Sequence, residues 1–164
     1  MDLIVSVDEN WAIGNKGDLL FRVSDDLKNF KRLTTGKTIL YGDKTMATFP
    51  KGKPLPNREN IVLAADPDFS AEGAETVHSL EELLAVVREK EEVYVVGGAS
   101  VYKLMLPYCK RAIITHFHSA KEADVFFPDL SKLPTWTMTE QGELRAEGDI
   151  TYSICTWENS EPLK

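Results

Sequence analysis

The chain has 164 residues, 43% of them hydrophobic and 27% charged, values typical of a globular protein that forms one domain over residues 1–164. A net charge of −7 disfavours nucleic acid and anionic membranes as main partners, so neither is expected. No apolar run approaches the roughly 18 residues of a membrane helix, and Met1–Val5 lacks the basic start of a signal peptide, so a cytoplasmic protein is expected.

Short runs rich in Val and Ile alternate along the chain with segments of helical character. The predicted strands are Leu3–Val7, Thr38–Tyr41, Asn60–Ala64, Val93–Val96 and Ala112–Thr115. The predicted helices are Asp25–Thr34, Lys44–Phe49, Leu80–Lys90 and Ser100–Leu106. Because the strands show little polar alternation, we expect both their faces to be covered, as in a parallel sheet. The alternating order predicts an α/β fold.

Two regions depart from this alternation. Trp136–Glu140 and Thr151–Glu158 alternate polar and apolar residues, which predicts a closing antiparallel hairpin. The segment Asn10–Arg22 is long and polar and contains Gly14 and Gly17. It fits either a mobile flap over a site or an ordinary surface loop.

The most informative residue is Asp26, in a predicted helix for which Ser24 is the expected N-cap. The apolar face of this helix is expected to carry Val23, Leu27, Phe30, Leu33 and Thr34. Asp26 projects inside that face, whereas Asp25 is expected to point toward water. A carboxylate is rarely left on an apolar face without a reason. It is either a functional group, or a buried acid that caps a turn or pairs with a base.

Two strand-to-helix junctions are suited to phosphate binding. One is Val96-Gly97-Gly98-Ala99-Ser100 and the other is Tyr41-Gly42-Asp43-Lys44-Thr45. A helix start offers free N–H groups, and glycine lets a phosphate approach the backbone. Each junction alone also fits a plain tight turn. Together in one sheet they suit a ligand with a pyrophosphate.

Other chemically active residues give weaker signals. His116 and His118 share one face of a strand without a third ligand, which favours ordinary hydrogen bonding, and no metal site is predicted. Cys109 and Cys155 lack metal or redox spacing and are expected in the core. Arg58 is either a clamp for a ligand carboxylate or a solvated loop residue.

In their order and spacing, these residues resemble the dihydrofolate reductase family over nearly the whole chain. The collinear elements are Ala12-Ile13-Gly14, Leu19, Asp26-Leu27, Phe30-Lys31, Gly42, Lys44-Thr45, Pro54 to Ile61, Val96-Gly97-Gly98, Val101-Tyr102, Thr115-His116, Asp124 and Phe127-Pro128. The resemblance implies a three-layer α/β fold with a central eight-stranded, mostly parallel sheet, a C-terminal antiparallel hairpin and four flanking helices. It also implies a monomer that reduces 7,8-dihydrofolate with NADPH and binds antifolates such as methotrexate or trimethoprim.

The resemblance assigns roles on the substrate side. Asp26 is expected to accept hydrogen bonds from the pterin 2-amino group and N3, with Thr115 supporting the contact. Leu19 and Phe21 complete the expected catalytic set. Hydride is expected to pass from nicotinamide C4 to pterin C6, with N5 protonated by water. The residues expected to line the substrate are Ile4, Val5, Ser6, Leu27, Phe30, Lys31, Phe49, Leu55, Arg58, Val96 and Tyr102. Among them, Arg58 matches the clamp on the glutamate α-carboxylate.

The resemblance likewise assigns the cofactor side. The segment from Ile13 to Leu19 matches a loop that closes over the cofactor, and the glycine pair matches one held in a cis peptide. The residues expected to contact the cofactor are Ser6, Ile13, Gly14, Gly17, Asp18, Leu19, Gly42, Asp43, Lys44, Thr45, Leu63, Ala64, Ala65, His78, Val96, Gly97, Gly98, Ala99, Ser100, Val101 and Tyr102.

The chain also departs from the family pattern. Leu20-Phe21 replaces the usual Pro-Trp pair, which removes an indole N–H near the pterin. Asp43 occupies a position where many relatives place an arginine on the NADPH 2′-phosphate, and Ser100 replaces another frequent arginine. Ala64-Ala65 stands where Ser or Thr is common. NADPH is expected as the cofactor, with appreciable use of NADH.

Two other functions remain open. The pyrimidine reductase of riboflavin synthesis shares the fold and the cofactor class, but its substrate has no glutamate tail for Arg58 to clamp. A non-catalytic nucleotide-binding module would have no use for Asp26 and Thr115.

Overall fold

The computed structural model describes residues 1–164 and contains twelve strands and four α-helices. The strands are β1 (Asp2–Val7), β2 (Ala12–Asn15), β3 (Asp18–Leu19), β4 (Thr38–Gly42), β5 (Glu59–Leu63), β6 (Glu75–Val77), β7 (Val93–Gly97), β8 (Arg111–Phe117), β9 (Val125–Phe126), β10 (Trp136–Gln141), β11 (Arg145–Glu147) and β12 (Ile150–Asn159). The helices are α1 (Ser24–Thr34), α2 (Asp43–Met46), α3 (Leu80–Arg88) and α4 (Ala99–Met105). None of them is long and apolar enough to cross a membrane.

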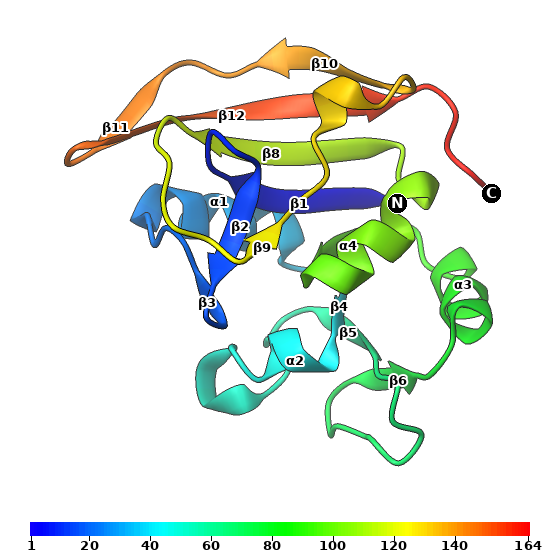
Figure 1. Ribbon diagram of the computed structural model, residues 1–164. Helices are drawn as coiled ribbons and strands as arrows, with labels where there is room; N and C mark the ends of the chain where they lie inside the picture. Colours follow the sequence, from blue (N-terminus) through cyan, green and yellow to red (C-terminus); the bar gives the residue numbers. More distant parts are fainter.

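One large sheet organises the molecule (Figure 1). Eight strands follow the order β10-β12-β8-β1-β7-β4-β5-β6, and β11 pairs with β12 as a ninth. The neighbours from β8 to β6 pair in parallel, whereas β12 pairs antiparallel to β8 and to β10. The mostly parallel sheet and its antiparallel C-terminal hairpin are therefore confirmed.

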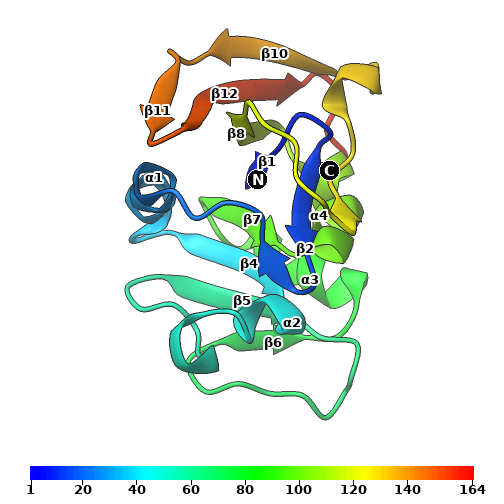
Figure 2. The same ribbon diagram turned by 60° about the vertical axis from the view of Figure 1, so that its left-hand side comes forward.

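The helices cover the sheet from both sides. Figure 2 shows α1 on one side of the sheet and α3 and α4 on the other. All five residues of β4 are buried, as expected for a strand covered on both faces. Helix α4 turns Val101, Tyr102 and Met105 inward, the spacing of one helix face. The main core cluster draws residues from Leu3 at one end of the chain to Trp157 at the other.

Several predicted boundaries differ from the structure. Helix α2 ends at Met46 rather than Phe49, because Pro50 favours an extended conformation at the residue before it, and Phe49 has φ −74° and ψ 160°. Ser24 is not the N-cap of α1. It lies inside the helix, Val23 precedes it in an extended conformation, and the Ser24 hydroxyl instead donates to Glu147 at 2.5 Å.

A second, three-stranded sheet was not predicted. It has the order β3-β2-β9 and holds most of the segment that was expected to be a flap or a surface loop. Within it, Gly14 pairs with Leu19 across a turn, and Ala12 pairs with Phe126 of β9. The segment is therefore a short hairpin attached to a distant part of the chain.

Candidate active site

Asp26 lies in the first turn of α1, facing the sheet. The Thr115 hydroxyl on β8 donates to its Oδ1 at 2.6 Å, and the Ser6 hydroxyl on β1 donates to its Oδ2 at 2.6 Å. Its partners are thus two side-chain hydroxyls, rather than a base or a helix N–H group. Each carboxylate oxygen keeps a lone pair for a further donor. The arrangement favours the functional interpretation of Asp26.

The helix face around Asp26 is only partly covered. Val23 and Thr34 are buried, Phe30 and Leu33 are half-buried, and Leu27 is 48% exposed. A leucine this exposed beside a carboxylate leaves apolar surface for a ligand ring.

Tyr102, on α4, connects this helix to β1. Its hydroxyl donates to the Ile4 carbonyl at 2.7 Å. Burial, and then the charge of Asp26, raise the pKa of Tyr102 above its ordinary value, so the phenol remains a neutral donor. This contact fixes β1 against α4 beside the predicted pterin and nicotinamide positions.

Four of the predicted apolar wall residues pack against one core cluster. That cluster is formed by Ile39, Tyr41, Val62 and Tyr94. The wall residues packed on it are Ile4, Phe49, Leu55 and Val96. Phe49 meets Tyr41 edge-on, with ring centroids 4.9 Å apart. The structure therefore brings together residues that lie far apart in the sequence.

Arg58 is held in place by its neighbours. Its Nε donates to the Thr34 hydroxyl at 2.9 Å, and Nη1 donates to the Pro56 carbonyl at 3.0 Å. Its guanidinium carbon lies 5.8 Å from the centre of the Phe30 ring. Burial lowers the pKa of Arg58, yet an arginine remains charged at any ordinary pH. The side chain is an oriented cation rather than a solvated loop residue.

Asn60, for which no role is predicted, supports the segment that carries Arg58. Its Nδ2 donates to the carbonyls of Leu55 and Arg58, at 2.9 and 3.1 Å. Its Oδ1 accepts from the Leu55 N–H at 3.1 Å and from the Tyr41 hydroxyl at 2.8 Å. A buried amide with all these bonds fixes the turn geometry.

The two predicted phosphate junctions meet at one edge of the sheet. Tyr41 of β4 lies beside Gly97 of β7, and Gly42 lies beside Leu63 of β5. The Gly97–Gly98 peptide is cis. A Cβ on Gly98 would lie 3.0 Å from the Thr45 hydroxyl oxygen, so a side chain there would displace Thr45. The two glycines allow Thr45 of α2 to pack directly against this junction, and no side chain of their own blocks a phosphate.

The residues expected near the cofactor's adenosine end also lie at this edge. Asp43 is half-buried in α2 and forms no ion pair, and Lys44 is exposed. Ala64 is fully buried at the end of β5, and its carbonyl is 3.0 Å from Nδ1 of His78. Ser100, in the first turn of α4, is exposed.

The β2–β3 hairpin, residues Ala12–Leu19, is called the flap hairpin below for its predicted role, and it is fastened to the β8–β9 connection. The Lys16 N–H donates to the Asp124 carboxylate at 3.1 Å, and the Asp124 N–H donates to the Gly14 carbonyl at 3.1 Å. Gly17 adopts φ 84° at the hairpin turn, a conformation that suits glycine. Leu19 at its end is 56% exposed, and Asp18 is also exposed.

Asp8 is a second residue without a role predicted from the sequence. It is 2% exposed, and its carboxylate accepts the N–H groups of Asn10, Ala12 and Lys121 at 2.8, 2.9 and 3.1 Å. It therefore joins the start of the flap to the β8–β9 connection.

Phe21 is buried between elements rather than open to solvent. Its ring stacks on Phe117 with centroids 4.2 Å apart, and the Lys121 ammonium lies 4.3 Å from the ring centre. Its cluster also contains Val23 and Tyr152. Phe21 thus belongs to an apolar cluster and has no N–H donor, and its place beside the pterin stays a prediction.

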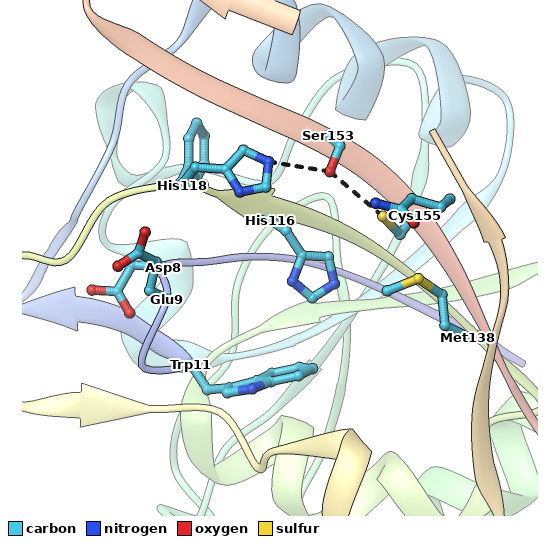
Figure 3. Close-up of a pocket in the computed structure, with 10 residues that line it drawn as sticks. Asp8, Glu9, Trp11, His116, His118, Met138, Ser153 and Cys155 are labelled. Atoms are coloured by element: carbon cyan, nitrogen blue, oxygen red, sulfur yellow. Dashed lines mark hydrogen bonds between the residues drawn. The ribbon is translucent and has the colours of Figure 1, made fainter. Parts of the chain in front are cut away.

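A separate cavity of about 220 Å³ lies beside β8 and β12 (Figure 3). His116, His118, Ser153 and Cys155 line it, together with Trp11 at the start of the flap. None of the residues predicted to bind substrate or cofactor lines this cavity. Nε2 of His116 accepts from the Trp157 indole at 3.1 Å, which agrees with ordinary hydrogen bonding.

His116 is expected to make stability depend on pH. Burial, and then the nearby His118, lower its pKa from 6.5 to about 4. The unfolded chain therefore takes up this proton below about pH 6.5 while the folded chain does not, so stability is lost as the pH falls toward 4. His116→Gln keeps an acceptor for Trp157. Between about pH 6.5 and pH 4, the free energy of unfolding of the variant should fall by about 1–2 kcal/mol less than that of the parent. This figure allows for the partly exposed ring. Urea unfolding at about pH 7 and about pH 4.5 measures the difference, and equal losses in both proteins would contradict it.

Comparisons with known proteins agree with one another. The family model described as dihydrofolate reductase matches residues 1–159. A dihydrofolate reductase of Bacillus subtilis is 34% identical and covers 100% of this chain and 97% of its own length. One from Neisseria gonorrhoeae is 37% identical, with 93% of each chain covered. A solved dihydrofolate reductase from Enterococcus faecalis, complexed with NADP(H) and RAB-propyl, superposes with a TM-score of 0.83 at 34% identity, covering 96% of this chain and 95% of that one.

Proposed function

Because this chain belongs to the dihydrofolate reductase family and reduces dihydrofolate with NADPH, we propose that Asp26 orients the pterin for the reaction. NADPH supplies the hydride when it is bound. Asp26 accepts hydrogen bonds from the pterin 2-amino group and N3–H, and its own orientation is set by Thr115 and Ser6. One observation carries this proposal. Both oxygens of a carboxylate on a partly open apolar helix face are held by hydroxyls at 2.6 Å.

The other end of the substrate is proposed to contact Arg58. The substrate ends in a glutamate, and a guanidinium already held by Thr34 and Pro56 presents its remaining N–H groups to a carboxylate. Phe30 and Leu27 supply apolar surface between Arg58 and Asp26 for the aminobenzoyl ring, and Lys31 lies one residue further along the exposed side of the helix.

The cofactor is proposed to lie along the carboxyl edge of the parallel strands. The Gly97–Gly98 backbone, with Thr45 packed against it, and Gly42 line that edge. These features fit a dinucleotide pyrophosphate. The flap hairpin, which ends at Leu19, closes one side.

The direct test mixes the purified protein with NADPH and dihydrofolate and follows the near-ultraviolet absorbance of NADPH. Absorbance should fall in proportion to the tetrahydrofolate formed, and methotrexate should compete with dihydrofolate. A protein that binds NADPH but leaves it unoxidised in the presence of dihydrofolate would support the nucleotide-binding module instead. Turnover of a deaminated pyrimidine, without turnover of dihydrofolate, would support the riboflavin-pathway enzyme.

A reduced preference for NADPH over NADH is also proposed. Asp43 places a carboxylate without an ion-pair partner at the edge where the family resemblance predicts the 2′-phosphate, and Ala64 and Ala65 offer no hydroxyl there. The ratio of kcat/KM for NADPH to that for NADH should lie below about 100-fold, which corresponds to about 2.7 kcal/mol. Asp43→Arg should raise this ratio, and Asp43→Asn should raise it less. A larger ratio in the parent protein would contradict the proposal.

We further propose that the chain acts as a single-domain, cytoplasmic monomer that methotrexate and trimethoprim inhibit. The continuous core from Leu3 to Trp157 supports a single domain. The large exposed apolar side chains, such as Leu19, Leu104 and Leu144, lie on different elements. Light scattering during size-exclusion chromatography tests the oligomeric state.

A further inference from the structure

We propose that Asp25, Tyr152 and Arg145 act as a positioning device for Asp26, a role that rests on the proposed function of Asp26. The Tyr152 hydroxyl donates to Oδ2 of Asp25 at 2.8 Å, and Nη1 of Arg145 donates to the same oxygen at 2.9 Å. These contacts join the first turn of α1 to the C-terminal hairpin. The Asp25 side chain is 42% exposed, so only part of it points toward water as the sequence had predicted.

The neighbouring residue strengthens the same connection. The Ser24 hydroxyl and N–H both donate to the Glu147 carboxylate, at 2.5 and 3.3 Å. Glu147 and Arg145 both belong to β11, and Tyr152 belongs to β12. Three consecutive residues of α1, starting at Ser24, are therefore each fixed by side chains from the sheet.

The register of the sheet makes this arrangement specific. Tyr152 lies opposite Phe117 on β8, two residues beyond Thr115. The adjacent carboxylates Asp25 and Asp26 are thus bound to adjacent strands at nearby positions. Consecutive helix residues project about 100° apart, so fixing both side chains fixes the rotation of the helix about its axis. If Asp25 is released, α1 can rotate, and the Asp26 carboxylate moves relative to the pterin.

The charges favour this contact at neutral pH. The hydrogen bond from Tyr152, and then that from Arg145, lower the pKa of Asp25, so it is ionised. Burial, and then the bond to Asp25, raise the pKa of Tyr152 to about 12, so it keeps its proton. The charge of Arg145 offsets that of Asp25, which limits the repulsion between the two neighbouring carboxylates.

Tyr152 also contacts the apolar cluster that contains Phe21. The Tyr152 ring packs against Phe117 with centroids 5.5 Å apart, and Phe117 stacks on Phe21. Removing the hydroxyl of Tyr152 leaves this packing intact. The variant Tyr152→Phe therefore isolates the hydrogen bond from the ring.

The test compares steady-state kinetics of Tyr152→Phe and Asp25→Asn with the parent protein. Each variant should raise KM for dihydrofolate about 5-fold, with KM for NADPH unchanged. This is less than the roughly 10-fold expected for a hydrogen bond made directly to a charged substrate group, because the contact is partly exposed and acts only through Asp26. The double variant should show no more than the larger single effect, because both changes remove the same contact. Arg145→Lys should retain more affinity for dihydrofolate than Arg145→Gln, because lysine keeps the positive charge beside Asp25.

Ser131→Ala is the matched control. It removes the exposed hydrogen bond from the Ser131 hydroxyl to Asp129, in the connection between β9 and β10, and it should leave KM for dihydrofolate unchanged. A lower melting temperature with unchanged KM in Tyr152→Phe, or additive effects in the double variant, would overturn the positioning role. If Asp26→Asn retained full activity, the proposed function itself would fail. An inactive Asp26→Asn with a normal Tyr152→Phe would overturn only this inference.

Discussion

Asp26→Asn is expected to lower kcat/KM for dihydrofolate about 10²- to 10³-fold, with less than about a 2-fold change in NADPH affinity. Asparagine has nearly the same shape but no charge, and its NH₂ group is a donor. Thr115 and Ser6 both donate to Asp26, so the amide would turn a donor toward one of them or toward the pterin. The pterin would lose both its orientation and its electrostatic partner.

Steady-state kinetics with dihydrofolate and a fluorescence titration with NADPH measure the two effects separately. Asp68→Asn is a matched control, because Asp68 is an exposed acid on the loop between β5 and β6. It should behave like the parent protein. Equal losses of NADPH affinity and dihydrofolate reduction in Asp26→Asn would mean that the substitution disturbs the whole site, and would contradict the assigned role.

The parts of the fold that the sequence predicted depend on local patterns. The strand predicted at Thr38–Tyr41 is confirmed as β4, which continues one residue further to Gly42 and is buried throughout. The small sheet of β2, β3 and β9 depends instead on pairing between Ala12 and Phe126, more than 100 residues apart. Strands this short carry too few residues for a periodic signal, so no local pattern could have predicted them.

The residues of the candidate site likewise divide into those with a local sequence signal and those without one. Asp26 was visible because a carboxylate interrupts an apolar helix face. Its partner Thr115 lies 89 residues away and was found only through the family resemblance. Asn60 and Asp8 were missed because their importance comes from backbone groups that only the folded chain brings to them. Asp25 was assigned to solvent, since its partner Tyr152 lies 127 residues away.

Arg58→Gln is expected to raise KM for dihydrofolate about 100-fold, with a smaller change in kcat. Two charge-assisted hydrogen bonds to a carboxylate together contribute about 3 kcal/mol, and the neutral amide cannot replace them. The contacts of Arg58 with Thr34 and Pro56 hold its guanidinium group in place before substrate arrives, so little side-chain entropy is lost on binding. Steady-state kinetics with varied dihydrofolate measure the effect.

A substrate without the glutamate tail separates this role from a general disturbance of the pocket. Dihydropteroate retains the pterin and the benzoate but lacks the glutamate α-carboxylate, so the parent protein and Arg58→Gln should bind it nearly equally. Arg58→Lys should fall between them with dihydrofolate, because an ammonium keeps the charge but not the planar fork. If Arg58→Gln weakened both substrates to the same extent, Arg58 would support the loop beside Thr34 rather than the carboxylate. The substrate carboxylate would then have to pair with another cation. Lys31 is the nearest candidate in the sequence, because it follows Phe30, whose ring lies against Arg58.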